Sequence, residues 1–476
     1  MHQPRLLVLC STSAVLAAFS VLLAFEPVYD PWAWLIWGRE VIAFDLDTSA
    51  GPSWKPLPVA VTALASPFGE QAPDIWLGVA RFGWLLSAGL VGRLAVRLVT
   101  GGPGLKLLAG LTAALSLILI ADDFTPWFVQ FSGGLSEPLL AALILLAIDR
   151  ELDSHRGAAL ASGFAATLIR PEAWPFFWAY AVIVSRRLPT MRAPALILSV
   201  LVLVLWFVPD VLGAGNPFEG ASRARQDTGA PLAEALEAVG RAAAMPLAAL
   251  WLLAIGFAWV EARAGHRVPA VLLLAAGGWV ALVAVGSAVG YAGLPRFMVP
   301  AAALACVLGG AGMARMVGAA VDWRASTNWR ASGMRLARGR VLVLTVVLGL
   351  AIVGQAVERA SRFPSDIREA SAFHRSVVDL FTTARMSAPV VSRCGDVTVS
   401  ELTVQSALAW ALERPLAEVD IRVRSAPQRG TAFVDRRHAA AVQASSAGGR
   451  AIISNGQWTV YEVGCPGDPA VTARRR

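Results

Sequence analysis

Runs of apolar residues long enough to cross a bilayer recur along most of this chain, and they constrain its fold more than any other feature. A membrane-spanning helix needs about 17–25 predominantly apolar residues. Hydrophobic residues make up 56% of the 476-residue chain and charged residues 16%, whereas about a quarter of the residues in soluble domains are charged. The sequence therefore predicts an α-helical polytopic membrane protein. It excludes a soluble enzyme, a disordered chain and a small disulfide scaffold.

We expect about eleven spans, some of them short enough to be tilted or re-entrant. Basic residues favour cytoplasmic loops, and most of them fall on the cytoplasmic side if the N-terminus is cytoplasmic. An odd number of spans then places the C-terminus outside. The formal net charge of +8 follows from this bias, so we expect no nucleic-acid partner. The predicted spans are residues 6–25, 75–98, 106–121, 135–148, 157–170, 172–185, 194–213, 246–262, 268–290, 297–318 and 341–358.

Three predicted outer segments are long: residues 26–74, residues 214–245 and residues 359–476. The tail mixes helix-like and strand-like patterns, and an Asn-Gly-Gln turn at 455–457 is typical of a hairpin. We expect a transmembrane domain over residues 1–358, with residues 26–74 as its first outer loop, and a small extracytoplasmic α/β domain over residues 359–476. The helix-like stretches of the tail are residues 366–386 and 399–413, and the strand-like ones are residues 389–393, 419–424, 451–454 and 458–463.

The cysteines divide between these two predicted domains. Cys10 and Cys306 lie in spans, whereas Cys394 and Cys465 lie in the tail. An outer domain meets an oxidising compartment, which favours a disulfide between Cys394 and Cys465. Closing a loop of that length would contribute ~4 kcal/mol in the chain-entropy model. The alternative is that both cysteines are unpaired, small hydrophobic residues.

The first outer loop combines acidic residues with tryptophans. Asp30 follows the first span and precedes Pro31, so it can cap a short helix that starts there. Trp32, Trp34 and Trp37 follow at a spacing typical of an amphipathic helix in the interfacial aromatic belt. That interpretation leaves unexplained why carboxylates at positions 26, 30, 40, 45 and 47 crowd the same membrane face.

Lys55 stands in the same loop, against the positive-inside bias. Pro56 and Pro58 restrict the backbone beside it. A cation held at the outer membrane surface is well placed to bind a lipid phosphate. The alternative is an ordinary lysine whose ammonium reaches the membrane surface and is solvated there.

Several motifs, taken in order, resemble those of the GT-C superfamily of integral membrane glycosyltransferases. In that family a carboxylate just after the first span is followed by a Lys-Pro-Pro-Leu-like motif, and Lys55-Pro56-Leu57-Pro58 differs by an exchange of Leu and Pro. Ser136-Glu137-Pro138-Leu139 resembles the family's Ser/Thr-Glu-Pro-Leu, and Ile169-Arg170-Pro171-Glu172 resembles its Thr-Arg-Pro-Glu. Arg296-Phe297, followed by Pro300, resembles Arg-Tyr-x-x-Pro. The resemblance covers roughly residues 20–310 and does not extend in detail to the tail.

The resemblance implies an inverting enzyme of a bacterial cytoplasmic (inner) membrane that transfers a sugar from a polyprenyl-phosphate donor to an outer acceptor. Such a reaction needs a carboxylate base and cations that stabilise the leaving phosphate. Asp30 is the candidate base, and Lys55 and Arg296 are the candidate phosphate-binding residues. Mannosyl, arabinofuranosyl, glucosyl and aminoarabinosyl donors all suit this kind of site. The acceptor is a protein, a glycolipid or a cell-wall glycan, and membrane lipids are further partners.

Two acidic groups are candidates for supporting roles. Glu26 is a reserve base or substrate contact. Asp122 and Asp123 sit where the third span ends, where they could bind a divalent metal or an acceptor, although such a pair is more often a solvated helix end. The histidines do not cluster at ligand spacing, so we expect no histidine metal site, and the sequence implies no definite cofactor.

Four further candidate substrate contacts have structural alternatives. Glu137 begins a span, where the helix dipole favours an anion. Arg170 and Glu172 flank a proline between two short spans and could form an internal ion pair, but charges at membrane depth are also candidates for function. Trp54 could stack on a sugar or prenyl chain, or anchor the loop in the aromatic belt.

A non-catalytic relative that scaffolds an envelope complex is one alternative, and a polytopic transporter or flippase of lipid-linked glycans accounts for the spans equally well. A transporter does not explain the Pro- and Trp-rich loop that carries Asp30 and Lys55. The hydrophobic pattern also shows no inverted repeat of the kind common in transporters.

Overall fold

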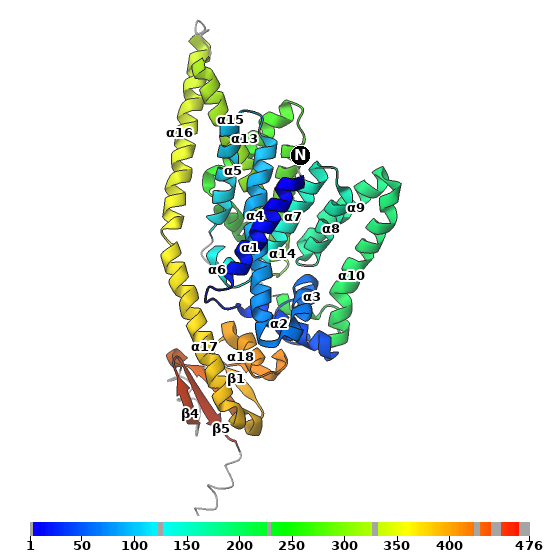
Figure 1. Cartoon of the computed structure of the whole chain (residues 1–476), viewed down its shortest axis with the longest axis vertical. Coiled ribbons are helices and arrows are strands. Elements are labelled where there is room, and N and C mark those ends of the chain that lie inside the picture. Colours follow the sequence, from blue (N-terminus) through cyan, green and yellow to red (C-terminus); the bar gives the residue numbers. More distant parts are fainter. Residues whose placement is uncertain are drawn as a thin grey trace, which may run out of the picture.

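The computed structural model describes residues 3–121, 127–225, 230–325, 332–422, 429–438 and 449–465. A body of packed helices carries a small domain with a five-stranded sheet at one end (Figure 1). Within the described residues, five helical segments are long and apolar enough to cross a membrane, or six if one bent helix pair is counted as a span. The predicted fold class, a helical membrane protein with a small C-terminal α/β domain, is confirmed.

Many of the predicted spans form helices shorter than a full bilayer crossing. α8 has 12 residues and α9 has 14, and η2 (Pro171–Ala173) separates them at the Arg170–Glu172 motif. The helices of the body are α1 (Gln3–Ser20), α2 (Tyr29–Ala43), α3 (Pro56–Ala65), α4 (Ala72–Leu98), α5 (Pro103–Ile118), α6 (Trp127–Ser132), α7 (Glu137–Leu152), α8 (Arg156–Thr167), α9 (Trp174–Arg187), α10 (Arg192–Ala214), α11 (Glu219–Ala224), α12 (Pro231–Ala244), α13 (Ala248–Arg263), α14 (Val268–Ala288), α15 (Val299–Ala325) and α16 (Ser332–Ala360).

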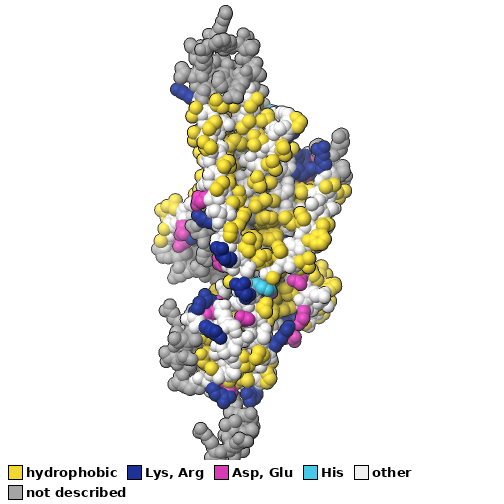
Figure 2. Space-filling view, turned by 60° about the vertical axis from the view of Figure 1, so that its left-hand side comes forward, with side chains coloured by type: hydrophobic (Ala, Val, Ile, Leu, Met, Phe, Trp, Pro, Cys, Tyr) yellow, Lys and Arg dark blue, Asp and Glu magenta, His cyan; other side chains and the backbone are white. Residues whose placement is uncertain are grey.

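α15 lies at the centre of the body, between α5 and α13, and α4 joins α5 and α7 beside it. Close approach depends on glycine: a Cβ on Gly310 would lie 2.7 Å from the carbonyl oxygen of Ala109 in α5. On the face shown in Figure 2 the surface of the body is largely apolar, whereas charged side chains gather near the junction with the sheet domain. This distribution suits a bilayer around the body and water around the domain.

α16 runs along one side of the body and is followed by α17 (Phe363–Cys394), which enters the C-terminal domain (Figure 1). The sheet has the order β2-β1-β3-β5-β4, in which β1 is parallel to β2 and β3, and β5 is antiparallel to β3 and β4. The remaining elements are β1 (Val397–Val399), α18 (Gln405–Ala411), β2 (Val419–Ile421), β3 (Gly430–Asp435), β4 (Arg450–Asn455) and β5 (Trp458–Val463).

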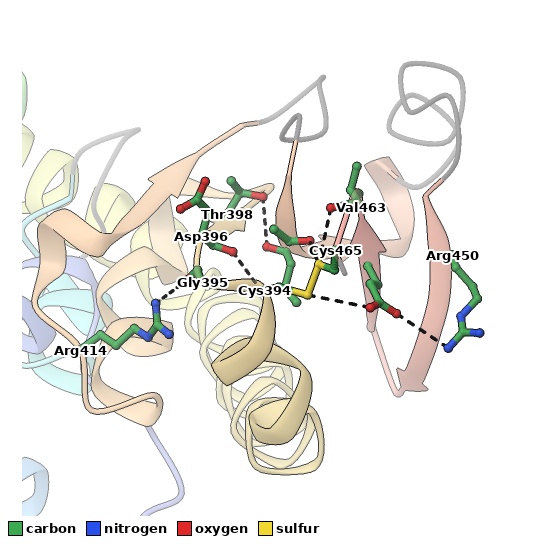
Figure 3. Close-up of a disulfide and its surroundings, with 11 residues drawn as sticks. Cys394, Gly395, Asp396, Thr398, Arg414, Arg450, Val463 and Cys465 are labelled. Carbon is green, nitrogen blue, oxygen red and sulfur yellow. Dashed lines mark hydrogen bonds and ion pairs between the residues drawn. A yellow bond between two sulfur atoms is a disulfide. The ribbon is translucent and has the colours of Figure 1, made fainter. Parts of the chain in front are cut away.

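The prediction of a strand at residues 389–393 is wrong, because α17 continues to Cys394. Val390 and Val391 suggest a strand locally, but Val377, Leu380 and Val391 line one buried face of the helix. Cys394 and Cys465 form a disulfide that joins the end of α17 to the second residue after β5 (Figure 3). Burial against the sheet therefore overrides the local preference of two β-branched residues.

The tryptophans of the first outer loop do not lie in an aromatic belt. Trp32, Trp34 and Trp37 in α2 are 1%, 0% and 0% exposed, because α2 is enclosed between the body and the C-terminal domain. They share a hydrophobic core with α17, α18 and the sheet, including Leu380 and Phe433. The loop and the tail, more than 300 residues apart in sequence, thus bury one common core.

Candidate active site

The helical hairpin of α2 and α3 brings Asp30 and Lys55 to one region. Gly38 allows the two helices to touch, because a Cβ there would lie 2.6 Å from the backbone of Thr62. The Thr62 hydroxyl donates to the Trp34 carbonyl at 2.6 Å, which secures the crossing. Asp30 occupies the first turn of α2, where the helix dipole favours a carboxylate. It does not cap the helix as expected, since the N-cap is Val28, with no side-chain hydrogen bond.

Glu137 is the centre of a buried ion cluster. Its carboxylate is 0% exposed, and its Oε1 lies 3.4 Å from Lys55 Nζ, 3.3 Å from Arg170 Nη1 and 3.8 Å from Arg296 Nε. Ser136 receives a further hydrogen bond from Lys55 at 3.0 Å. Three cations from three separate loops therefore converge on the N-terminus of α7, where the helix dipole also favours an anion.

Two of these cations have a second acidic partner. Arg170 donates to Glu172 through Nε and Nη2 at 3.1 and 2.8 Å, which is the internal ion pair foreseen for this motif. Arg296 donates to Asp30 Oδ2 at 3.1 Å. Lys55 forms an ion pair with Glu137 alone among the described carboxylates.

Lys55 is not a solvated lysine. It is 6% exposed, and its ammonium lies 4.8 Å from the ring centroid of Trp34, a cation–π arrangement. On the other side of the cluster, the Arg170 guanidinium lies 3.4 Å from the ring centroid of Phe297. Trp279 donates to the Phe297 carbonyl at 2.8 Å and thereby anchors η4 (Pro295–Met298), which carries Arg296.

The other candidates lie elsewhere or have structural partners. Trp54 is buried, donates to the Leu205 carbonyl at 3.0 Å and packs on Trp37, so its ring faces protein. Asp122 and Asp123 lie outside the described residues. Cys394 and Cys465 are in the C-terminal domain and, with Glu462, form the one cluster of metal-ligand type within the described residues. Their sulfurs are joined in the disulfide, so this cluster offers no thiolate to a metal.

Sequence reasoning did not single out Ser136, Trp34 or Phe297 as parts of the cluster. Ser136 and Phe297 stood in the quoted motifs, where the neighbouring charged residue drew attention instead. Trp34 was assigned to the membrane interface. Only the folded loop shows that its ring faces the ammonium of Lys55.

Comparison with known proteins identifies the fold. The structure is similar to the crystal structure of ArnT from Cupriavidus metallidurans in the apo state, with a TM-score of 0.55 and 16% identity over 97% of this chain and 98% of ArnT. The same protein bound to undecaprenyl phosphate gives a TM-score of 0.54 and 16% identity over 96% and 97% of the two chains. No family profile and no curated protein matches the sequence. At this identity the likeness establishes a shared membrane fold.

Glu26 lies apart from the cluster, at the junction with the C-terminal domain. Its Oε1 lies 3.1 Å from Nδ1 of His374 in α17. Burial, with the nearby charge of Asp74, raises the pKa of Glu26 to about 7, although Arg81 acts in the opposite direction. Burial also lowers the pKa of His374. This junction therefore contains a carboxyl group that titrates near neutral pH, Glu26, beside an imidazole whose pKa is lowered.

We predict that Glu26→Gln removes a pH-dependent loss of stability. Since the folded-state pKa of Glu26 is about 7 and its ordinary value is 4.5, its contribution is complete below about pH 4.5 and is lost as the pH rises through 7. His374, with a lowered pKa, acts in the opposite sense in both proteins. Thermal unfolding should be measured in detergent micelles from pH 5 to 8. Over this range the free energy of unfolding of the variant should rise relative to that of wild type, by on the order of 1–3 kcal/mol. Parallel pH profiles would contradict the assignment.

Proposed function

We propose that this chain is an integral membrane glycosyltransferase that uses a polyprenyl-phosphate sugar. The observation that carries the proposal is the cluster in which Asp30 and Arg296 lie 3.1 Å apart, beside the buried Lys55 and Glu137. A base and two phosphate-binding cations are what a single-displacement sugar transfer requires. The fold likeness to ArnT, which has been crystallised with undecaprenyl phosphate, supports this class of donor.

The reaction is an inverting displacement at the anomeric carbon. The acceptor hydroxyl attacks that carbon while Asp30 takes its proton, and the bond to the phosphate oxygen breaks with its electron pair remaining on the polyprenyl phosphate. Lys55 and Arg296 stabilise the phosphate that leaves. When phosphate binds Arg296, it competes with the Asp30–Arg296 ion pair and frees the carboxylate to act as base.

The orientation of the chain follows from its basic loops. We place the N-terminus in the cytoplasm and the ion cluster and C-terminal domain on the outer side of a bacterial cytoplasmic membrane. Donor and acceptor then meet outside, where polyprenyl-linked sugars are presented. A panel of mannosyl, arabinofuranosyl and aminoarabinosyl donors with protein, glycolipid and glycan acceptors would identify both substrates.

The orientation predicts opposite accessibility at two exposed positions. Ser392 lies near the end of α17, and Ala264 lies in the turn between α13 and α14 beside Arg263. In a Cys10→Ala background, a membrane-impermeant maleimide added to intact spheroplasts should label Ser392→Cys and leave Ala264→Cys unlabelled until the membrane is opened. Labelling of Ala264→Cys from outside would overturn the orientation.

We predict that Asp30→Asn abolishes transfer and leaves donor binding intact. Loss of a general base lowers the rate by about 10²–10⁴-fold, whereas the amide still accepts a hydrogen bond from Arg296. The measurement is transfer of a radiolabelled sugar in proteoliposomes, with Asp45→Asn, an exposed carboxylate of the same loop, as the matched control. Normal turnover by Asp30→Asn would place the base elsewhere. Donor movement across the membrane without transfer in wild type would favour the flippase.

We predict that Lys55→Ala weakens binding of polyprenyl phosphate and that Lys55→Arg retains part of it. Removing one charged partner from a buried site costs roughly 2–5 kcal/mol of binding free energy. Donor affinity measured by calorimetry would test this, with the exposed Lys106→Ala as control. Because Lys55 is also an ion-pair partner of Glu137, thermal unfolding of each variant shows whether its removal destabilises the fold. Unchanged affinity in a folded Lys55→Ala protein would leave Arg296 as the phosphate ligand and exclude the assigned role of Lys55.

A further inference from the structure

The helix that carries Asp30 begins without a side-chain cap. The first turn of a helix leaves backbone N–H groups unsatisfied, and a Ser, Thr, Asp or Asn at the N-cap normally provides an acceptor. α2 has Val28 at this position and no side-chain hydrogen bond. Asp30 lies only two residues further on, in the part of a helix that frays most readily.

Two hydrogen bonds to the C-terminal domain restrain this turn in another way, since neither involves a backbone N–H of α2. The Ser406 hydroxyl, at the start of α18, donates to the backbone carbonyl of Tyr29 at 2.8 Å. The Tyr29 hydroxyl in turn donates to Gln405 Oε1 at 3.1 Å. The backbone carbonyl and the side-chain hydroxyl of Tyr29 are therefore each hydrogen-bonded to one of two adjacent side chains, Ser406 and Gln405. These two residues lie more than 370 positions further along the sequence.

The orientation of Gln405 is itself determined. Its Nε2 donates to the carbonyl of Val419 in β2 at 2.6 Å, so its oxygen must face Tyr29. Gln405 is 6% exposed and Ser406 is 0% exposed. A buried, fully directed amide and hydroxyl form a rigid contact, in contrast to a solvated surface interaction.

Aromatic packing extends the contact along α2. The Trp32 ring lies 5.4 Å from Phe381 of α17 and 5.8 Å from Trp410 of α18, measured between centroids. The Arg39 guanidinium stands 5.2 Å from the Trp410 ring. α18 thus contacts α2 from Tyr29, in its first turn, to Arg39.

We propose that the C-terminal domain is a positioning element for the catalytic base, acting through Ser406 and Gln405 on the Tyr29–Asp30 turn. This inference rests on the proposed function of Asp30. The two side chains do not touch the reacting atoms. They fix the backbone from which the carboxylate projects, and displacement of a reacting group by about 1 Å can cost a hundredfold in rate.

The test uses the full chain in nanodiscs. Ser406→Ala should lower kcat about 3–30-fold with the donor KM changed less than twofold, because the phosphate-binding residues are untouched. Ser406→Thr keeps the hydroxyl and should recover most of kcat. Tyr29→Phe removes only the bond to Gln405 and should have a smaller effect of the same kind.

Ser400→Ala is the matched control. The Ser400 hydroxyl is buried, accepts a hydrogen bond from the backbone N–H of Asp435 at 2.9 Å, and lies wholly within the C-terminal domain. Its loss should lower the thermal stability of that domain as much as Ser406→Ala does, with kcat unchanged. An equal fall in kcat in both variants would mean that general destabilisation is the cause and would overturn the proposal.

A second readout does not depend on activity. Hydrogen–deuterium exchange of a peptide covering residues 29–37 should speed up in Ser406→Ala and stay at the wild-type rate in Ser400→Ala. If wild type transfers no sugar, the proposed function fails, but this exchange difference still decides whether the domain holds the turn. Unchanged exchange in Ser406→Ala, or faster exchange with kcat unaltered, would overturn the positioning role.

Discussion

The burial of Glu137 among Lys55, Arg170 and Arg296 is the interaction on which the rest of the site depends. A buried charge without partners costs several kcal/mol, so such a group is tolerated only where cations are delivered to it. Here they come from the start of α3, the break between α8 and α9, and the turn before α15. The cluster therefore determines how three irregular segments converge at the beginning of α7.

Irregular backbone carries two of the three cations. Arg170 stands at the start of η2, between the short helices α8 and α9, and Arg296 lies in η4, which leads directly into α15. Both side chains point toward the Glu137 carboxylate. Asp30 completes the arrangement through Arg296 and links the cluster to α2.

A second, apolar constraint couples this charged region to the C-terminal domain. The tryptophans of α2 fill a core to which Leu380, Phe433 and Trp458 also belong. Because one core serves both segments, the position of α2 depends on a domain that is added at the end of the chain. The hydrogen bonds to Tyr29 lie at the edge of this core, where apolar packing alone would not fix the first turn.

Local sequence patterns predicted some features of the structure correctly and others wrongly. The short motifs around Glu137, Arg170 and Arg296 were recognisable because each contains a charged residue next to a proline or aromatic residue in an apolar context. The tail was recognisable as α/β from its alternation, but β1 and β3 were missed, and residues 389–393 were assigned to a strand. Amphipathic burial of α17 from Ser376 to Cys394, which no local window captures, decided that case.

By itself, the sequence determined that the chain is a helical membrane protein with an α/β tail. The length and composition of an apolar segment are local properties, and they determine directly whether that segment can span a bilayer. Only the tertiary structure decided that Lys55 is buried beside Trp34, that Trp32 packs under the C-terminal domain, and that Asp30 pairs with Arg296. Each of these contacts joins residues that are distant in sequence or separated by a turn. Their partners are therefore set by how helices pack in three dimensions and not by the residues that flank them.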